Sequence, residues 1–435
     1  MTKKTNLFLK IFADFWDHFK IFRANYVSKY FDDIVKKVAS CADLQEGFVR
    51  YQCLHCGRDE RVIGFTCKHA FCLRCGSIKA MQFVEEIKAK LYPEINYRHL
   101  TLTVHEEFWK VFYKHHFSNE IFDQFYQVAW DFIRDVFQTV THKMNIEVGA
   151  IMVIHVTGRD GSYNVHLHIL LPMGCIDGTS GKWIDIPRLP YNLLHHRWQE
   201  HFLKMMKEFD QSDWMKALIH KIKKHYRKGF VANLDERILP KGGGRLAKYL
   251  AKYLFRPSIS VKRIIEYDKD KETVEFEYQD HQTHKMEVTK ISVMDFIGRM
   301  VQQIMPKKFQ RVRYFGLHAT KTWKKSRRKI INGLKRMMGI EPDPNEKVLL
   351  KQARQLSHRE KILDWRKRDP LKCKHCGCTM ELVEIWIKGR GTIFDLFKIL
   401  KRSADPPPIR TVTEKEKIKD ACKGNCLGVQ LELPF

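Results

Sequence analysis

Cysteines gather in two clusters toward opposite ends of this 435-residue chain. The first cluster contains Cys53, Cys56, Cys67, Cys72 and Cys75, and the second contains Cys373, Cys376, Cys378, Cys422 and Cys426. The long segment between them contains only Cys175. The start of the chain lacks the uncharged core and small-residue cleavage site of a signal peptide, so we expect a cytoplasmic protein, in which disulfides are rare. The clusters therefore predict two metal-binding modules around a cysteine-poor core.

The first cluster has two C-x2-C pairs, a spacing typical of a structural tetrahedral zinc site. The predicted ligands of one Zn²⁺ are Cys53, Cys56, Cys72 and Cys75. Cys67 and His69 are further candidate ligands. A second zinc site is predicted from Cys373, Cys376, Cys422 and Cys426, with His375 and Cys378 as alternative ligands. Free buried cysteines are the other interpretation of the first cluster.

The chain carries a large excess of positive charge, with 78 Lys and Arg against 50 Asp and Glu and a net charge of +28. Such an excess favours a nucleic-acid partner over a basic surface that is only solvated. Residues 307–336 contain twelve Lys and Arg, no acidic residue, and the rings of Tyr314, Phe315 and Trp323, which can stack on unpaired bases. The predicted DNA-binding residues are Arg311, Arg313, Lys324, Lys325, Arg327 and Arg328. A solvated helix face is the alternative for this segment.

An apolar stretch at residues 7–22 is interrupted by four charged residues, so it cannot span a bilayer. Its apolar positions recur at helical spacing, which predicts an amphipathic helix packed on the protein itself. We therefore expect no membrane partner.

The central segment predicts an α+β fold. Residues 98–104, 148–156 and 165–171 have the composition and alternation of strands, and turn residues at 158–162 predict that the last two form a hairpin. Residues 119–144 and 192–209 have helical patterns. Residues 273–278 and 285–289 predict another hairpin.

Two histidines alternate within the strand at residues 165–171. Side chains on a strand alternate between faces, so His166 and His168 point to the same side. His155, on the preceding strand of the hairpin, is placed to reach the same ion. Three imidazoles predict a divalent metal site with positions open for substrate oxygens. Ordinary polar residues on a half-exposed sheet are the alternative.

A pair of tyrosines follows the glycine triplet at residues 242–244. Tyr249 and Tyr253 are four residues apart on a predicted short helix, so they share one face. A phenol has a pKa of about 10 and is a poor nucleophile at neutral pH, so it needs a phosphate that is already polarised. Lys252 and Lys248 add positive charge near the leaving oxygen. An aromatic pair that only packs the helix is the alternative.

These motifs together resemble the rolling-circle insertion-sequence transposases with two tyrosines, which belong to the HUH endonuclease group. The resemblance rests on residues 155–174, 248–257 and 311–319 and on the first cysteine cluster. It implies an HUH-type antiparallel sheet with helices packed on it, Mg²⁺ or Mn²⁺ bound by His166 and His168, and a zinc-binding domain. His155 as a third ligand follows from the relaxases of this group. Imidazoles suit Mn²⁺ better than Mg²⁺, so the identity of the metal stays open.

The resemblance also implies the reaction. Tyr249 and Tyr253 are expected to cleave single-stranded DNA at element ends and target, leaving 5′-phosphotyrosine links whose rejoining needs no ATP. Two other functions stay open: a plasmid replication initiator or relaxase with the same chemistry, and a zinc-dependent DNA-binding protein without catalysis. The expected domains are an N-terminal helical segment (1–40), a zinc-binding domain (41–95), the catalytic domain (96–320), a basic DNA-binding segment (321–370) and a C-terminal cysteine module (371–435). We expect association with the bacterial nucleoid.

Overall fold

The computed structural model describes residues 5–69, 71–72, 75–158, 160–235, 259, 263–279, 283, 285–343, 357, 359–360, 363 and 369–402. The chain forms two compact units: a larger one of residues 1–39 and 68–355, and a smaller one of residues 40–67 and 356–435. The smaller unit thus combines segments that the sequence assigns to two separate modules. Within the described residues, no helix has both the length and the apolar character needed to cross a membrane.

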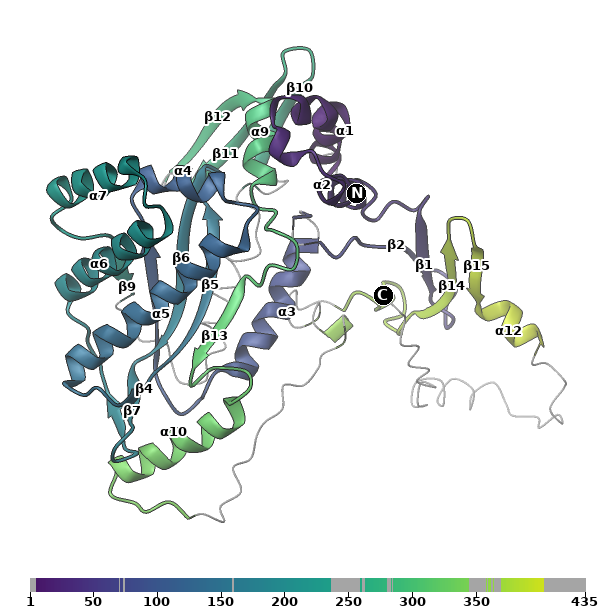
Figure 1. Ribbon diagram of the computed structural model, residues 1–435. Coiled ribbons are helices and arrows are strands. Elements are labelled where there is room, and N and C mark those ends of the chain that lie inside the picture. The colour runs from purple at the N-terminus through teal and green to yellow at the C-terminus, as the bar shows by residue number, and fades with distance from the viewer. Residues whose placement is uncertain are drawn as a thin grey trace. The chain divides into compact units, whose positions relative to one another are not determined.

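A five-stranded antiparallel sheet is the centre of the larger unit (Figure 1). Its strands, in spatial order, are β13 (Val312–Gly316), β5 (Gly149–Thr157), β6 (Tyr163–Pro172), β3 (Tyr97–Thr103) and β9 (Ala232–Leu234). The predicted hairpin is confirmed as β5 and β6, and the strand predicted at residues 98–104 is β3. The predicted α+β class with an antiparallel sheet is likewise confirmed.

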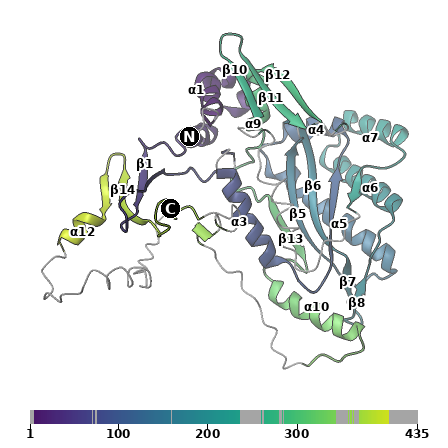
Figure 2. The same ribbon diagram turned by 180° about the vertical axis from the view of Figure 1, so that it is seen from behind.

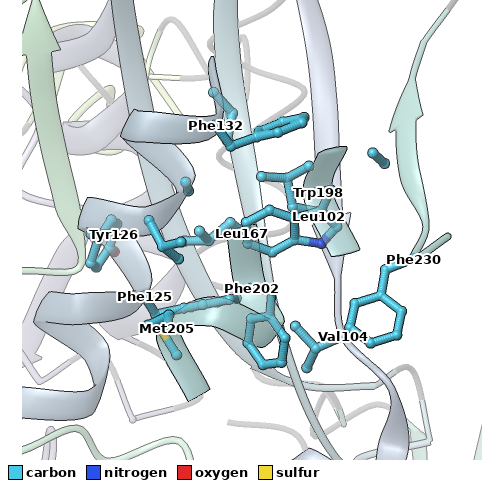
Figure 3. Packing of buried hydrophobic residues seen from close by; sticks show 14 of the residues in the cluster. Leu102, Val104, Phe125, Tyr126, Phe132, Leu167, Trp198, Phe202, Met205 and Phe230 are labelled. Atoms are coloured by element: carbon cyan, nitrogen blue, oxygen red, sulfur yellow. The ribbon is translucent and has the colours of Figure 1, made fainter. Parts of the chain in front are cut away.

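One face of this sheet is apolar and is covered by helices. The inward residues alternate along each strand, so that Leu102, Ile154 and Leu167 all belong to one buried cluster. Figure 3 shows side chains of α5 (Asn119–Thr141) and α6 (Tyr191–Phe209) packed on this face, among them Phe125 and Phe202. Helix α5 ends three residues before its predicted end, because His142 adopts a left-handed conformation with φ +54°.

Two shorter helices flank the same core. They are α4 (Glu106–Lys114) and α7 (Asp213–His225). Side-chain caps fix where α5 and α7 begin: Ser118 accepts from the Glu120 amide at α5, and Ser212 accepts from the Met215 amide at α7.

The remaining elements of the larger unit surround the sheet. One group of elements that contact one another comprises α1 (Thr5–Phe22), η1 (Ala24–Tyr26), α2 (Lys29–Ala39), α9 (Val293–Val301) and the sheet of β10 (Ile264–Asp268), β11 (Thr273–Gln279) and β12 (Met286–Ser292). A small sheet consists of β4 (Ile146–Glu147), β7 (Gly174–Asp177) and β8 (Trp183–Asp185). Helices α3 (Cys75–Lys90) and α10 (Trp323–Met337) lie toward the β13 edge, where Trp323 Nε1 donates to Lys90 O at 3.0 Å (Figures 1 and 2).

The smaller unit is a four-stranded antiparallel sheet followed by a short helix. Its order is β15 (Gly391–Asp395), β14 (Glu381–Ile387), β1 (Gly47–Gln52) and β2 (Glu60–Gly64), and α12 (Leu396–Arg402) follows β15. Strands β1 and β14 pair over their whole length, with Phe48 opposite Trp386. The expected domains placed residues 41–95 and 371–435 in separate modules. The structure joins parts of both in one unit, because β1 pairs with a strand that lies more than 300 residues away in the sequence.

Candidate functional site

Three histidines of the β5–β6 hairpin meet on the sheet face that points away from α5. His155 lies directly opposite His166 in the pairing register, and His168 follows two residues later, opposite Val153. One ring nitrogen from each histidine lies within 4.8 Å of the others. The tight turn at residues 158–162, in which Gly161 has φ +83°, sets this register. The predicted trio is therefore brought together by the hairpin alone.

Hydrogen bonds orient the rings of this histidine trio. His166 Nδ1 donates to the Asn164 carbonyl oxygen at 2.9 Å, which leaves its Nε2 as an acceptor. That atom lies 3.2 Å from His155 Nδ1, and His155 Nε2 lies 3.4 Å from Thr157 Oγ1. Two nitrogen ligands about 2.1 Å from one ion lie about 3 Å apart when their bonds are perpendicular. The spacing of His155 and His166 matches that value.

A fourth histidine supports the trio from the neighbouring strand. His99 Nε2 lies 2.9 Å from His168 Nδ1, and the two rings are stacked with centroids 5.1 Å apart. A metal-bound histidine commonly donates its other ring nitrogen to such a partner, which fixes its tautomer. His99 was not among the predicted site residues. Alternation in the strand at residues 98–104 places His99 on the same face as Thr101, but the pairing of Thr101 with His168 is seen only in the fold.

Burial keeps these imidazoles neutral. It holds the pKa of His155 and His168 well below the usual value, and the charge that His166 would carry lowers both further. Burial lowers the pKa of His166 itself to about 4. Neutral imidazoles keep their lone pairs at physiological pH, which is the form that binds metal. Three convergent, neutral nitrogen donors therefore fit a divalent transition-metal ion better than Mg²⁺, which prefers oxygen.

The predicted nucleophiles cannot be placed beside the trio. Tyr249, Tyr253 and Lys252 lie outside the described residues, as does the glycine triplet before them. Their role stays a prediction.

The predicted DNA-binding residues divide into two groups. Arg313 pairs with Asp123 and lies over the Tyr126 ring, 4.3 Å from its centroid, and Arg327 is buried and paired with Glu94 at 3.1 Å. These two side chains are engaged within the fold. The exposed cations of the set lie on α10 and are Lys324, Lys325 and Arg328.

Arg311 and the aromatic rings of this segment also serve the fold. Arg311 donates to the Gln303 carbonyl, and burial lowers its pKa to about 10. Phe315 stacks on Trp130 with centroids 5.4 Å apart, and Trp323 stacks on Tyr92 at 5.9 Å. Both rings therefore contribute to internal packing, and the base-stacking role expected for them stays a prediction.

The cysteines combine differently from the predicted sets. In the smaller unit, Cys53 and Cys56 lie with Cys373 and Cys376, all four sulfurs within 4.8 Å of one another. Cys72 and Cys75, their predicted partners, belong to the larger unit, where Cys75 begins α3. Cys67 lies beside Cys41, with its amide 3.5 Å from the Cys41 sulfur. Cys422 and Cys426 lie outside the described residues. The C-x2-C spacing identified the pairs, but their combination depends on the β1–β14 contact.

Two protein families and two curated proteins match large parts of the chain. Residues 149–327, which include the histidine trio, match the family described as "Putative transposase", and residues 11–104 match the family described as "Transposase zinc-binding domain". The transposase for insertion sequence element IS801 of Pseudomonas savastanoi pv. phaseolicola is 23% identical over 364 residues, covering 80% of this chain and 82% of that protein. The "Putative transposase y4qJ" of Sinorhizobium fredii is 24% identical over 278 residues, covering 61% of this chain and 68% of that protein. No solved structure matches the chain.

Both families and the first of these relatives agree with the resemblance seen in the sequence motifs. The two matched segments occur in the expected order, with the zinc-binding domain before the strands that carry the histidines. The chain therefore belongs to the IS91/IS801 family of rolling-circle transposases, and it includes that family's zinc-binding domain.

Proposed function

We propose that this transposase cuts and rejoins single-stranded DNA at the ends of an insertion sequence through covalent tyrosine–DNA links. The observation that carries the proposal is the convergence of three neutral imidazoles on one sheet face, with ligand atoms within 4.8 Å of one another. A metal ion held there would act as a Lewis acid on the oxygens of a bound phosphodiester. His155, His166 and His168 would hold the ion, and His99 would orient the ring of His168.

The proposed cleavage uses the phenol of Tyr249 or Tyr253 as nucleophile. The phenol oxygen attacks phosphorus, and the bond between phosphorus and the 3′ oxygen breaks. The upstream strand leaves with a 3′ hydroxyl, which gains the proton that the phenol loses. The downstream strand stays on the protein through its 5′ phosphate, and attack by a 3′ hydroxyl reverses the step. Lys252 supplies positive charge near the leaving oxygen. The support for the tyrosine roles is their spacing in the sequence and the family to which the chain belongs.

The DNA partner of the proposed reaction also accounts for the charge of the chain. A net charge of +28 suits a polyanion, and Lys324, Lys325 and Arg328 form an exposed cationic group on α10. We propose that these three side chains contact the backbone of the strand.

Transfer of a labelled strand to the protein tests this function. Single-stranded oligonucleotides from candidate element ends carry a fluorophore at the 3′ end, because the downstream fragment is the one that stays bound. They are incubated with full-length protein and Mn²⁺ and resolved on a denaturing gel. We expect a covalent adduct with wild-type protein and none with Tyr249→Phe/Tyr253→Phe or with His166→Ala/His168→Ala. The exposed His220 of α7 offers a matched control, His220→Ala, which should form the adduct.

Two results would contradict the proposal. An adduct that persists when both tyrosines are Phe would assign the nucleophile elsewhere. The absence of any adduct, with DNA binding intact, would favour a zinc-dependent DNA-binding protein without catalysis.

A further inference from the structure

Two short segments near opposite ends of the described chain have the same sequence pattern. Residues 53–57 read C-L-H-C-G and residues 373–377 read C-K-H-C-G, so each is C-x-H-C-G. The first lies between β1 and β2, and the second precedes β14. We call these segments the first and second knuckle.

The two knuckles have the same backbone conformation. The glycine that ends each one has a positive φ, +66° at Gly57 and +75° at Gly377, which a side chain would strain. Its amide donates to the carbonyl of the first cysteine, at 2.9 Å from Cys53 and 3.1 Å from Cys373. In both, an amide two residues further on donates to the sulfur of the second cysteine: Arg58 to Cys56, and Cys378 to Cys376. Backbone amides directed at sulfur stabilise a thiolate.

The four sulfurs of the knuckles face one another. Cys53 Sγ lies 3.4 Å from Cys376 Sγ, and Cys56 Sγ lies 3.6 Å from both Cys53 Sγ and Cys373 Sγ. A disulfide requires about 2.05 Å. Four thiolates around one Zn²⁺, each at about 2.3 Å, would be about 3.8 Å apart. The observed distances are close to the zinc arrangement and far from a disulfide.

Contacts around the sulfurs join the knuckles to each other. The Asp59 carboxylate accepts from the Lys374 amide at 2.8 Å, and Arg61 donates to the Pro370 and Lys372 carbonyls. The apolar residues beside the sulfurs are few: the buried cluster consists of Cys53, Cys373 and Met380, with Tyr51 partly buried against it. This small apolar cluster is not enough to order the two knuckles. The cysteines themselves must therefore supply the contact that stabilises the knuckles.

We propose that Cys53, Cys56, Cys373 and Cys376 bind one structural zinc ion, which closes a zinc ribbon made from two ends of the chain. The β1–β2 hairpin contributes one knuckle and the segment before β14 contributes the other, and the β1–β14 pairing holds them in register. The match to the family's zinc-binding domain stops at residue 104, so half of these ligands lie outside it. The zinc ion thus makes the folding of the first hairpin depend on residues 369–395.

Metal content of paired variants tests the proposal on the full chain. Cys53→Ser/Cys56→Ser and Cys373→Ser/Cys376→Ser should each lose one equivalent of zinc, measured by mass spectrometry of the metal. The variant with all four substitutions should lose the same single equivalent, because both pairs serve one ion. Cys378→Ser is the matched control: Cys378 directly follows the second knuckle, and its contribution to the site is its backbone amide. It should keep the zinc content of the wild type.

Three results would contradict the shared zinc site. A loss of two equivalents in the fourfold variant would mean two independent ions and would overturn the shared site. Zinc loss in Cys378→Ser would overturn the ligand assignment, since Cys378 and His55 also lie within 4.8 Å of Cys376. If the serine variants do not fold, Cys56→His and Cys376→His carry the test, because imidazole also binds zinc. With Co²⁺ in place of Zn²⁺, each should keep the metal and lose the charge-transfer absorption of one thiolate. An unchanged spectrum in either would contradict the site.

Discussion

Removing the ring nitrogen that contacts His168 should weaken metal binding without unfolding the protein. In His99→Phe, the phenyl ring can keep the stacking on His168, whose centroid is 5.1 Å away, while the 2.9 Å hydrogen bond is lost. Partners of this kind are typically worth 10- to 100-fold in metal affinity, or about 1.4 to 2.7 kcal/mol. We expect the Kd for Mn²⁺ to rise by about that factor. The substitution also removes a hydrogen bond of the buried His168 Nδ1, so it should lower the free energy of unfolding by about 1 to 3 kcal/mol, which leaves the protein folded.

Titration with Mn²⁺, followed by the electron paramagnetic resonance of the free ion, measures this change. Mn²⁺ is a hard ion that thiolate sites bind poorly, so the zinc sites do not interfere. His99→Gln restores a hydrogen-bond acceptor and should recover part of the affinity. Thr101→Val removes a hydroxyl 3.5 Å from His99 and should have little effect. The reasoning would be refuted if His99→Phe bound Mn²⁺ as tightly as the wild type, or if its loss of binding simply followed loss of folded protein in urea.

Three further changes test other parts of the structure. Phe202→Ala removes a fully buried ring that contacts four other phenylalanines. It should lower the free energy of unfolding, measured by urea denaturation, by about 3 to 5 kcal/mol. A decrease below about 1 kcal/mol would contradict the packing. Burial lowers the pKa of His318 to about 3, whereas an unfolded histidine titrates near 6.5, so this residue should make stability fall as pH decreases from about 6.5 toward 3. At pH 4.5 this titration should lower the free energy of unfolding by about 2.7 kcal/mol. In His318→Gln, the urea midpoint should therefore depend less on pH. An unchanged pH dependence of the midpoint would contradict a buried, neutral His318 ring. The triple variant Lys324→Gln/Lys325→Gln/Arg328→Gln should bind single-stranded DNA with a weaker salt dependence. The slope of log affinity against log salt should become about 2 smaller, since each phosphate contact contributes about 0.7. The same reduction after replacing three exposed lysines of α7 with Gln would contradict an interface on α10.

Local patterns predicted the parts of the fold that depend on neighbours in the sequence. The alternation at residues 165–171 placed His166 and His168 on one face, and the short turn at 158–162 brought His155 opposite His166. Both inferences need only strand geometry and a hairpin. Whether the trio binds a metal, and whether Tyr249 and Tyr253 act as nucleophiles, stay predictions.

Non-local pairing decided what the patterns could not. His99 reaches His168 because β3 lies next to β6, and no local signal shows which strands are neighbours in a sheet. In the same way, C-x2-C spacing identifies two ligands of a site but not the pair that completes it. Charge counts have a related weakness: Arg313 and Arg327 add to a basic run in the sequence, yet both are paired with carboxylates in the fold.

The pairing of β1 with β14 sets an order of events during synthesis of the chain. Cys56 leaves the ribosome 317 residues before Cys373, which is roughly 15 to 60 s at 5 to 20 residues per second. Throughout that interval the β1–β2 hairpin has an open strand edge and two thiols without their partners from the second knuckle. A chain that ends before residue 373 would keep this open edge, to which a strand of another chain can pair.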